Sequence, residues 1–327
     1  MAREWNTVLV LAIAALLDYL VGDPWNWWHP VQGMGWVITH SSKLAWKWLK
    51  APLPLRIAGI GLGVGLIAGS GGLGWVIAAG TNRIHPLVGV AVQSVLLASC
   101  FAGRSLREAA TDVLCPLQAG DLEQARSRLC LYVGRDVENL PEPEILRAVL
   151  ETVTENATDG VMAPLFYALL GAFIPGGGSL PLALGYKAAS TLDSMVGYRT
   201  PLYADLGWFS AKVDDVLTWV PCRLLVLTLS LVSRKPHQVW RMCLRDAPQD
   251  PSPNSGWSEC VYAAILGVQL GGVNYYKGVA KPKPLLGDPV QAIAPSHIHK
   301  ALHLTRVCFL IWFIGAVVFK GILIGWS

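Results

Sequence analysis

Apolar residues are gathered into long runs in this chain. No Asp, Glu, Lys or Arg occurs in residues 57–82, 84–103 or 160–186. Shorter, mostly apolar runs occupy residues 7–17, 216–232 and 307–326. A helix that crosses the hydrocarbon core of a bilayer needs about 20 mostly apolar residues. The pattern therefore predicts an all-α, polytopic integral membrane protein with five to six spans, joined by helical cytoplasmic loops.

The run at residues 160–186 differs from the others because helix-breaking residues interrupt it. Pro175 is followed by three glycines, and Pro164 and Pro181 lie on either side. Non-helical backbone at membrane depth is tolerated only where protein or a wet cavity satisfies its polar groups. We expect a broken or re-entrant helix here rather than one straight span.

Composition supports the membrane class. Only 15% of the 327 residues are charged and 53% are hydrophobic, which leaves too little polar surface for a soluble protein and excludes a disordered chain. Basic residues follow the first and third spans, at positions 43–56 and 104–107. Such residues favour the cytoplasmic side, so we expect a multi-pass protein of the inner cell membrane. The bilayer is an expected partner, nucleic acid is not, and self-association stays open.

Residues 104–159 reverse the apolar character, with six Arg, eleven acids and no Lys. We expect helices over 104–117, 122–132 and from Glu144 onwards, and little strand signal is found anywhere. The chain is interpreted as a single domain, residues 1–327. Residues 104–159 would form a polar helical cytoplasmic insertion, and residues 234–306 a basic C-terminal loop region.

An acidic stripe is predicted on the helix that starts at Glu144. Arg147, Glu151, Glu155 and Asp159 are spaced four apart, which puts them on one helix face. One interpretation is a solvated face on which Arg147 pairs with Glu151. The other is a metal–phosphate site, because Mg²⁺ prefers a few carboxylates together with phosphate oxygens and water.

Polar residues also gather at 187–199 and at the start of the 216–232 run. The second group is the pair Asp214 and Asp215. Aromatic anchoring at the membrane interface accounts for Tyr198 but not for the acids. Acids at a membrane boundary are unfavourable unless they are paired or bound to a cation.

Several blocks, in order along nearly the whole chain, resemble the CobD/CbiB family. They are Leu17-Asp18 with Gly22-Asp23-Pro24 and His29-Pro30, then Val133-Gly134-Arg135-Asp136, residues 151–160, residues 186–199, and Asp214-Asp215. This family makes adenosylcobinamide phosphate in cobalamin biosynthesis. The resemblance implies an ATP-dependent amide ligase. It would join adenosylcobyric acid to (R)-1-amino-2-propanol O-phosphate, or to aminopropanol.

The resemblance also implies roles for the clustered residues. ATP would be the co-substrate, and Mg²⁺ would neutralise the transferring phosphoryl group. The residues suited to hold the metal are Glu151, Glu155, Asp159, Asp214 and Asp215, with Glu155 and Asp159 also taken as catalytic. Those suited to bind phosphate or substrate are Arg135, Asn156, Lys187, Tyr198 and Arg199. The base that deprotonates the amine would be Asp193 or His29.

Two other functions remain open from the sequence. A small-molecule transporter also uses broken helices flanked by charged residues. A non-enzymatic membrane sensor could share the fold without the chemistry. The ligase requires the clusters to face the cytoplasm, where ATP is found, and this favours a re-entrant segment at 160–186.

Overall fold

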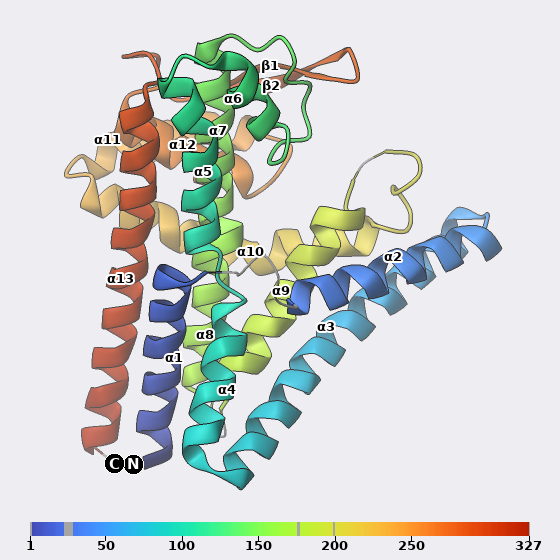
Figure 1. Cartoon of the computed structure of the whole chain (residues 1–327), viewed down its shortest axis with the longest axis vertical. Helices are drawn as coiled ribbons and strands as arrows, with labels where there is room; N and C mark the ends of the chain where they lie inside the picture. Colours follow the sequence, from blue (N-terminus) through green and yellow to red (C-terminus); the bar gives the residue numbers. More distant parts are fainter. Residues whose placement is uncertain (1, 23–28, 175–176, 199, 327) are drawn as a thin grey trace. The chain divides into compact units, whose positions relative to one another are not determined.

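The computed structural model describes residues 2–22, 29–174, 177–198 and 200–326. The chain divides into two compact units, whose helices and strands are labelled in Figure 1. Unit 1 comprises Met1–Arg104, Ala163–Leu217 and Ile311–Ser327, and unit 2 comprises Ser105–Met162 and Thr218–Leu310. Three helices contribute residues to both units: α5 (Gly103–Gln118), α10 (Trp208–Val232) and α13 (Pro295–Trp326).

Unit 1 is built from helices. Its remaining helices are α1 (Ala2–Leu20), α2 (Pro30–Trp48), α3 (Pro52–Ile84), α4 (Pro86–Ala98), α8 (Ala163–Ala172) and α9 (Ser179–Val196). Helix α9 packs against α2, α3, α4 and α8, so it forms the centre of this unit. Its buried side chains, such as Leu192 and Val196, meet Ile38 of α2 in one apolar cluster.

The helical membrane class is confirmed. Among the described residues, four helical stretches are long and apolar enough to cross a bilayer. They are Pro52–Ile84, Pro86–Gln118 (which joins α4 and α5), Trp208–Val232 and Pro295–Leu323. Asn6–Leu20 is also apolar but shorter. Apolar side chains such as Trp75, Ile314 and Phe319 are exposed on these helices, as expected for surfaces that face lipid.

The expected break in the third apolar run is confirmed. Helix α8 ends at Ala172 and α9 begins at Ser179, and the two pack against each other. Gly171 and Gly178 approach so closely that a Cβ on Gly171 would overlap the Gly178 carbonyl. Lys320 of α13 is buried and donates to the Ala172 carbonyl at 2.6 Å, so it satisfies the end of α8 instead of extending to a lipid headgroup.

Unit 2 combines short helices with one β-hairpin. Its elements besides the three shared helices are α6 (Leu122–Leu129), α7 (Glu142–Asn156), η1 (Ala157–Met162), α11 (Pro236–Asp246), η2 (Ala247–Gln249), α12 (Ser255–Leu266), β1 (Leu270–Tyr276) and β2 (Val279–Leu286). Helix α7 is buried along most of its length and packs against α6, α12 and β1. It is therefore the core of unit 2.

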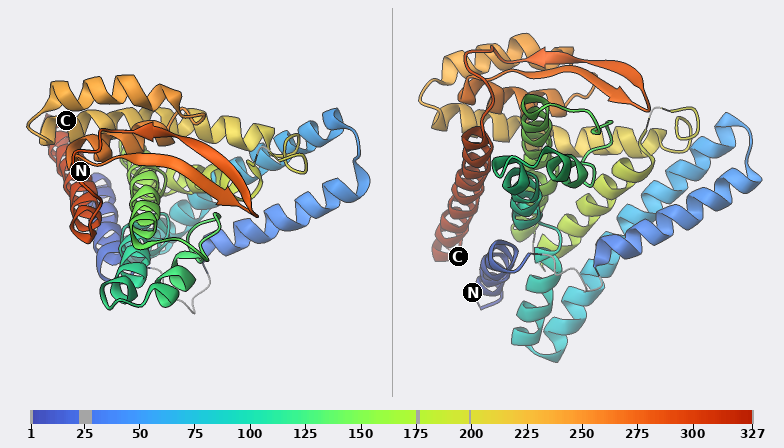
Figure 2. Two further views of the ribbon diagram at one scale, coloured as in Figure 1. Left: turned by 90° about the horizontal axis from the view of Figure 1, so that it is seen from above. Right: turned by 45° about the horizontal axis from the view of Figure 1, so that its top comes forward.

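The expectation of little strand structure is wrong for residues 270–286. Strands β1 and β2 pair antiparallel, and they are the orange arrows in Figure 2. Lys277 and Gly278 form the turn with positive φ angles of 51° and 76°, as a two-residue hairpin turn requires. The register shifts between Leu270 and Gly272, where Gly271 forms a bulge.

The expected helices in the polar segment are present as α5, α6 and α7. The predicted acidic stripe, however, continues as an α-helix only as far as Glu155. Asp159 lies in η1, a π-helix, whose wider turn changes the angular spacing. Asp159 therefore lies in a different helix type from Arg147, Glu151 and Glu155, and its place in the stripe stays a prediction.

Candidate functional site

A buried ion network lies on the C-terminal half of α7. The Glu151 carboxylate, 1% exposed, accepts hydrogen bonds from Arg147 at 2.8 Å and from Arg135 on the loop before α7. Arg147 also donates to Glu144 one turn earlier at 3.0 Å. The pairing of Arg147 with Glu151 is thus present, but it is buried rather than on a solvated face.

Strand β1 supplies the other half of this network. The Asn274 side-chain oxygen accepts from Arg135 at 2.8 Å and from Arg147 at 2.9 Å. At the bulge, the Gly271 amide donates to Glu151 at 2.9 Å and its carbonyl accepts from Arg147 at 2.7 Å. Gly271 has a φ of 87°, and a Cβ there would overlap the Pro284 carbonyl. The backbone of β1 can therefore bind α7 this way only with glycine at 271.

Electrostatics keep this network charged. Burial alone would raise the pKa of Glu151, but Arg135, Arg147 and Lys283 outweigh it and hold the pKa below its ordinary value. Burial alone would lower the pKa of Arg147, but Glu144 and Glu151 outweigh it and raise the pKa. Opposite charges in contact stabilise each other's ionised forms. Glu151 is therefore a carboxylate at neutral pH.

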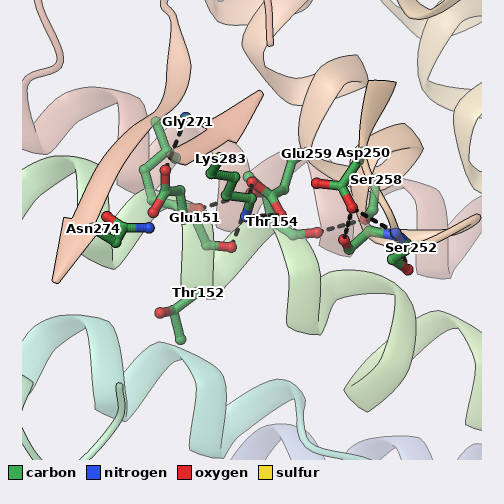
Figure 3. Close-up of polar contacts among 12 residues, drawn as sticks. Glu151, Thr152, Thr154, Asp250, Ser252, Ser258, Glu259, Gly271, Asn274 and Lys283 are labelled. Carbon is green, nitrogen blue, oxygen red and sulfur yellow. Dashed lines mark hydrogen bonds and ion pairs between the residues drawn. The ribbon is translucent and has the colours of Figure 1, made fainter. Parts of the chain in front are cut away.

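A second buried ion pair joins β2 to α12 (Figure 3). Lys283 donates to both oxygens of Glu259, at 2.7 and 2.8 Å, and Glu259 is fully buried. Burial is the largest influence on Glu259 and raises its pKa well above the ordinary value, despite the opposing effect of Lys283. Burial would lower the pKa of Lys283, but Glu259, Glu151 and Glu155 outweigh it and raise the pKa.

Glu155 lies one turn beyond Glu151, beside this second pair. It is half-buried, and the structure gives its carboxylate no hydrogen-bond or ion-pair partner among the described residues. Burial raises its pKa, nearby Asp250 and Glu151 add to the rise, and Lys283 opposes it. Its oxygens can therefore still accept a ligand, whereas those of Glu151 and Glu259 are engaged.

The end of α7 is fastened to α12 through hydroxyl groups. Ser258 donates to the Thr154 carbonyl at 2.5 Å and lies 2.7 Å from the Thr158 hydroxyl (Figure 3). Asn156 is exposed and its side-chain amide donates to the Thr152 carbonyl at 2.9 Å. The π-helix therefore begins where α12 holds the backbone, and such turns are frequent at functional sites.

Unit 2 contains a cavity of about 920 Å³, and Arg147 is one of the residues that line it. It is lined by the loop before α7, the first turn of α7, the hairpin, and the segment that follows β2. Arg147 and Gly271 belong both to its wall and to the ion network. A molecule bound in the cavity would therefore contact two members of the ion network.

The other predicted site residues belong to unit 1. Asp193 and Asp215 lie close enough to Asp214 for direct charge repulsion, and Oδ1 of Asp214 is buried with no hydrogen-bond donor. Lys212 is 4.0 Å from Asp215. These three aspartates form a like-charge cluster that Lys212 approaches at Asp215.

The remaining predictions in unit 1 have varied surroundings. His29 accepts a hydrogen bond from the Val31 amide at 3.2 Å through Nδ1, so it caps α2. Tyr198 is exposed and contacts Tyr203 edge to face. Lys187 is half-buried on α9. Arg199 lies outside the described residues, as do Asp23 and Pro24 of the first sequence block.

The described residues do not offer a metal cage made by protein alone. No three His, Cys, Asp or Glu side chains among them are placed to share one ion. Mg²⁺ that arrives with nucleotide phosphates needs only one or two carboxylates. Glu155 meets that lower requirement in unit 2, so the residues fit Mg²⁺ brought by a phosphate ligand. Which acids hold the metal stays a prediction.

Sequence reasoning missed three residues at this site: Asn274, Lys283 and Glu259. Asn274 and Lys283 stand in a segment interpreted as loop, and Glu259 is a single acid in an apolar helix. The available signal was the isolation of Glu259, because a lone acid among apolar residues requires a cationic partner.

Comparisons with known proteins match the chain along most of its length. A family model described as "CobD/Cbib protein" matches residues 11–305. "Cobalamin biosynthesis protein CobD" of Synechocystis sp. is 54% identical over 303 residues, covering 93% of this chain and 89% of that protein. "Cobalamin biosynthesis protein CbiB" of Salmonella arizonae is 39% identical over 302 residues, covering 91% and 92%. No solved structure matches.

Proposed function

Because this chain belongs to the CobD/CbiB family, we propose that it acts in cobalamin biosynthesis as an ATP-dependent amide ligase. It joins the free propionate of adenosylcobyric acid to (R)-1-amino-2-propanol O-phosphate, or to aminopropanol. The products are the amide, ADP and phosphate.

One structural observation supports this proposal independently of the family match. Two blocks that are distant in the sequence, residues 133–136 and 151–160, converge in unit 2. Arg135 from the first meets Glu151 from the second in a network that is nearly excluded from water. Buried charged networks with shifted pKa values are enriched at functional sites. The convergence supports a chemical role for these blocks beyond a solvated helix face.

The chemistry assigns distinct tasks to the side chains. A propionate oxygen attacks the γ-phosphorus of ATP and displaces ADP, and the amine nitrogen then attacks the resulting acyl phosphate and displaces phosphate. Mg²⁺ would supply charge neutralisation at the phosphoryl group. Glu155 offers it a carboxylate, and Asp159, Asp214 and Asp215 are further candidates. Arg135 is held by Glu151 and Asn274, so it presents a fixed positive charge to phosphate or carboxylate oxygens.

Proton removal from the amine requires a base. Asp193 is the better candidate, because it is a carboxylate on α9 that lies near Asp214. His29 is the second candidate, although its Nδ1 is engaged in capping α2. Lys187, Tyr198, Arg199 and Asn156 are proposed to bind substrate oxygens.

The deciding experiment uses the purified full chain in detergent with ATP, Mg²⁺, adenosylcobyric acid and aminopropanol phosphate. We expect a corrinoid product whose mass has increased by that of the amine less one water, together with one ADP per amide. Glu155→Gln should abolish the product. Glu142→Gln, the same change at an exposed position of α7, should keep it. Corrinoid movement across vesicles without amide formation would support a transporter, and binding alone a sensor.

Orientation is tested separately by thiol labelling. The exposed Cys115 and Cys130 are first replaced by Ser, and single cysteines are then placed at the exposed positions Asn156 and Ser194. An impermeant maleimide applied to inside-out vesicles should label both. Labelling of the two from opposite sides would contradict a single cytoplasmic active site.

A further inference from the structure

The cavity in unit 2 has a lining unsuited to the phosphate-bearing reactants. Its charged lining residues are Asp136, Glu138, Glu144 and Arg147. Arg147 is already paired with Glu144 and Glu151. The lining therefore carries excess negative charge, which repels nucleotide phosphates and aminopropanol phosphate alike.

Two neutral side chains of the cavity, Gln269 and Gln291, offer hydrogen-bond acceptors, and Asn139 can both donate and accept. Gln269 donates its amide nitrogen to the Gly287 carbonyl at 3.0 Å, and Gln291 donates to the Leu266 carbonyl at 2.7 Å. These bonds fix the side-chain orientations, and the described residues provide no donor to Oε1 of either glutamine. With the carboxylates, these oxygens favour a ligand rich in N–H groups.

The volume of the cavity indicates how large its ligand is. Ligand pockets range from about 300 to 1,000 Å³, and about 920 Å³ lies near the upper limit. Apolar lining comes from residues such as Tyr275, Leu285 and Ile293. A small amine phosphate would leave most of this volume empty. A corrin ring has apolar faces and an amide-fringed rim, which matches both the volume and the acceptors.

We propose that this cavity binds the amide-bearing edge of the corrinoid substrate, with the ring face against Tyr275, Leu285 and Ile293. The choice of a corrinoid rests on the proposed function. The side-chain amides of the corrinoid donate to the carboxylate and glutamine oxygens. The phosphate-bearing reactants bind elsewhere.

The test measures corrinoid binding directly, without turnover. Ala292 lines the cavity and is exposed, so Ala292→Trp fills the space with little strain. Ala280 on β2 is also exposed but does not line it, so Ala280→Trp is the matched control. By equilibrium dialysis of the full chain with adenosylcobyric acid, we expect Ala292→Trp to weaken binding about tenfold or more. Ala280→Trp should leave it unchanged, and ATP binding should be unchanged in both.

A charge reversal provides an independent measurement. Glu138 is exposed in the lining, so Glu138→Lys should fold normally and weaken corrinoid binding about threefold to tenfold through loss of an acceptor. Glu123→Lys on α6, exposed and outside the cavity, is its control. If Glu138→Lys instead tightens ATP binding and spares the corrinoid, the cavity is a nucleotide site and the inference is wrong.

The outcomes separate this inference from the ligase proposal. Wild-type protein that binds adenosylcobyric acid through this cavity but forms no amide refutes the ligase and leaves the cavity assignment standing. Wild-type protein that forms the amide, with Ala292→Trp and Glu138→Lys unchanged in corrinoid affinity, refutes the cavity assignment alone. Absence of corrinoid binding by wild-type protein refutes both.

Discussion

Buried carboxylates have different charged neighbours in the two units. In unit 2, Glu151 contacts two arginines and Glu259 contacts Lys283, so both acids have a cation within hydrogen-bond distance. In unit 1, Asp214 is surrounded by the charges of Asp193 and Asp215, and its buried Oδ1 has no donor. The buried acids of unit 2 each contact a cation, whereas the three aspartates of unit 1 lie close to one another.

This difference separates stability from function. Removing one member of a compensated pair leaves a buried charge without a counter-charge, and the fold weakens. Removing one member of a like-charge cluster relieves repulsion, and the fold does not weaken. Repulsion that a protein retains is commonly linked to activity. Substitution of a clustered aspartate in unit 1 should therefore reduce activity with little loss of stability, whereas breaking a charge pair in unit 2 should reduce stability.

The largest expected effect follows from removing the charge of Glu151. Glu151→Gln leaves Arg135 and Arg147 buried beside a neutral group, so we expect the free energy of unfolding to fall by about 3–5 kcal/mol. Denaturant unfolding in detergent, followed by circular dichroism, measures it. Glu142→Gln on the exposed first turn of α7 should change stability very little. Equal stability of the two variants would show that the network is not compensated as described.

The same stabilisation should depend on pH in one direction. Because the pKa of Glu151 is lower in the folded chain than its ordinary 4.5, the unfolded chain binds more protons at acidic pH. The contribution of Glu151 is thus fully present above pH 4.5 and is lost as the pH falls through the folded pKa. The stability gap between wild type and Glu151→Gln should stay constant from pH 7 to 5.5 and close below 4.5. A gap that widens in acid would contradict the sign of the pKa shift.

The Lys283–Glu259 pair should show strong coupling. Lys283→Met leaves Glu259 buried and unpaired, and we expect a loss of about 2–3 kcal/mol, since Lys283 is partly exposed to water. The double variant with Glu259→Leu should recover most of it, because neither charge then remains. A double-mutant cycle measures the coupling. Additive losses would show that the two side chains do not stabilise each other.

Asp214→Asn should separate activity from stability. We expect amide formation to fall strongly, while the unfolding free energy changes by less than about 1 kcal/mol, because the buried Oδ1 of Asp214 has no hydrogen bond to lose. Asp205→Asn breaks the exposed pair with Arg56 and should reduce stability by less than about 1 kcal/mol with activity kept. If Asp214→Asn retained activity, the aspartate cluster would not be part of the active site.

Local signals made parts of this structure predictable. The break between α8 and α9 follows from one proline and three glycines, whose backbone cannot continue a helix. The contact of Arg147 with Glu151 follows from four-residue spacing on a helix. Both depend on residues close in the chain, so helix geometry alone was sufficient.

The hairpin and its contacts could not be predicted in the same way. Pro282 and Pro284 within β2 are atypical of strands, and Lys residues alternate with them, so the segment resembled a loop. The bulge at Gly271 and the pairing of Lys283 with Glu259 depend on tertiary packing. The π-helix after Asn156 likewise has no local sequence signal, so the helix type around Asp159 could not be predicted.

The tip of the hairpin is exposed, yet its two turn amides are held by a side chain from another segment. Asp136 accepts from the Lys277 amide at 2.8 Å and from the Gly278 amide at 2.7 Å, while its own amide donates to Tyr275. Exposed turns normally exchange their amide hydrogens with solvent first. Here the exchange rates of Lys277 and Gly278 report on the loop before α7, and deuterium uptake at the tip becomes a direct measure of how often that loop opens.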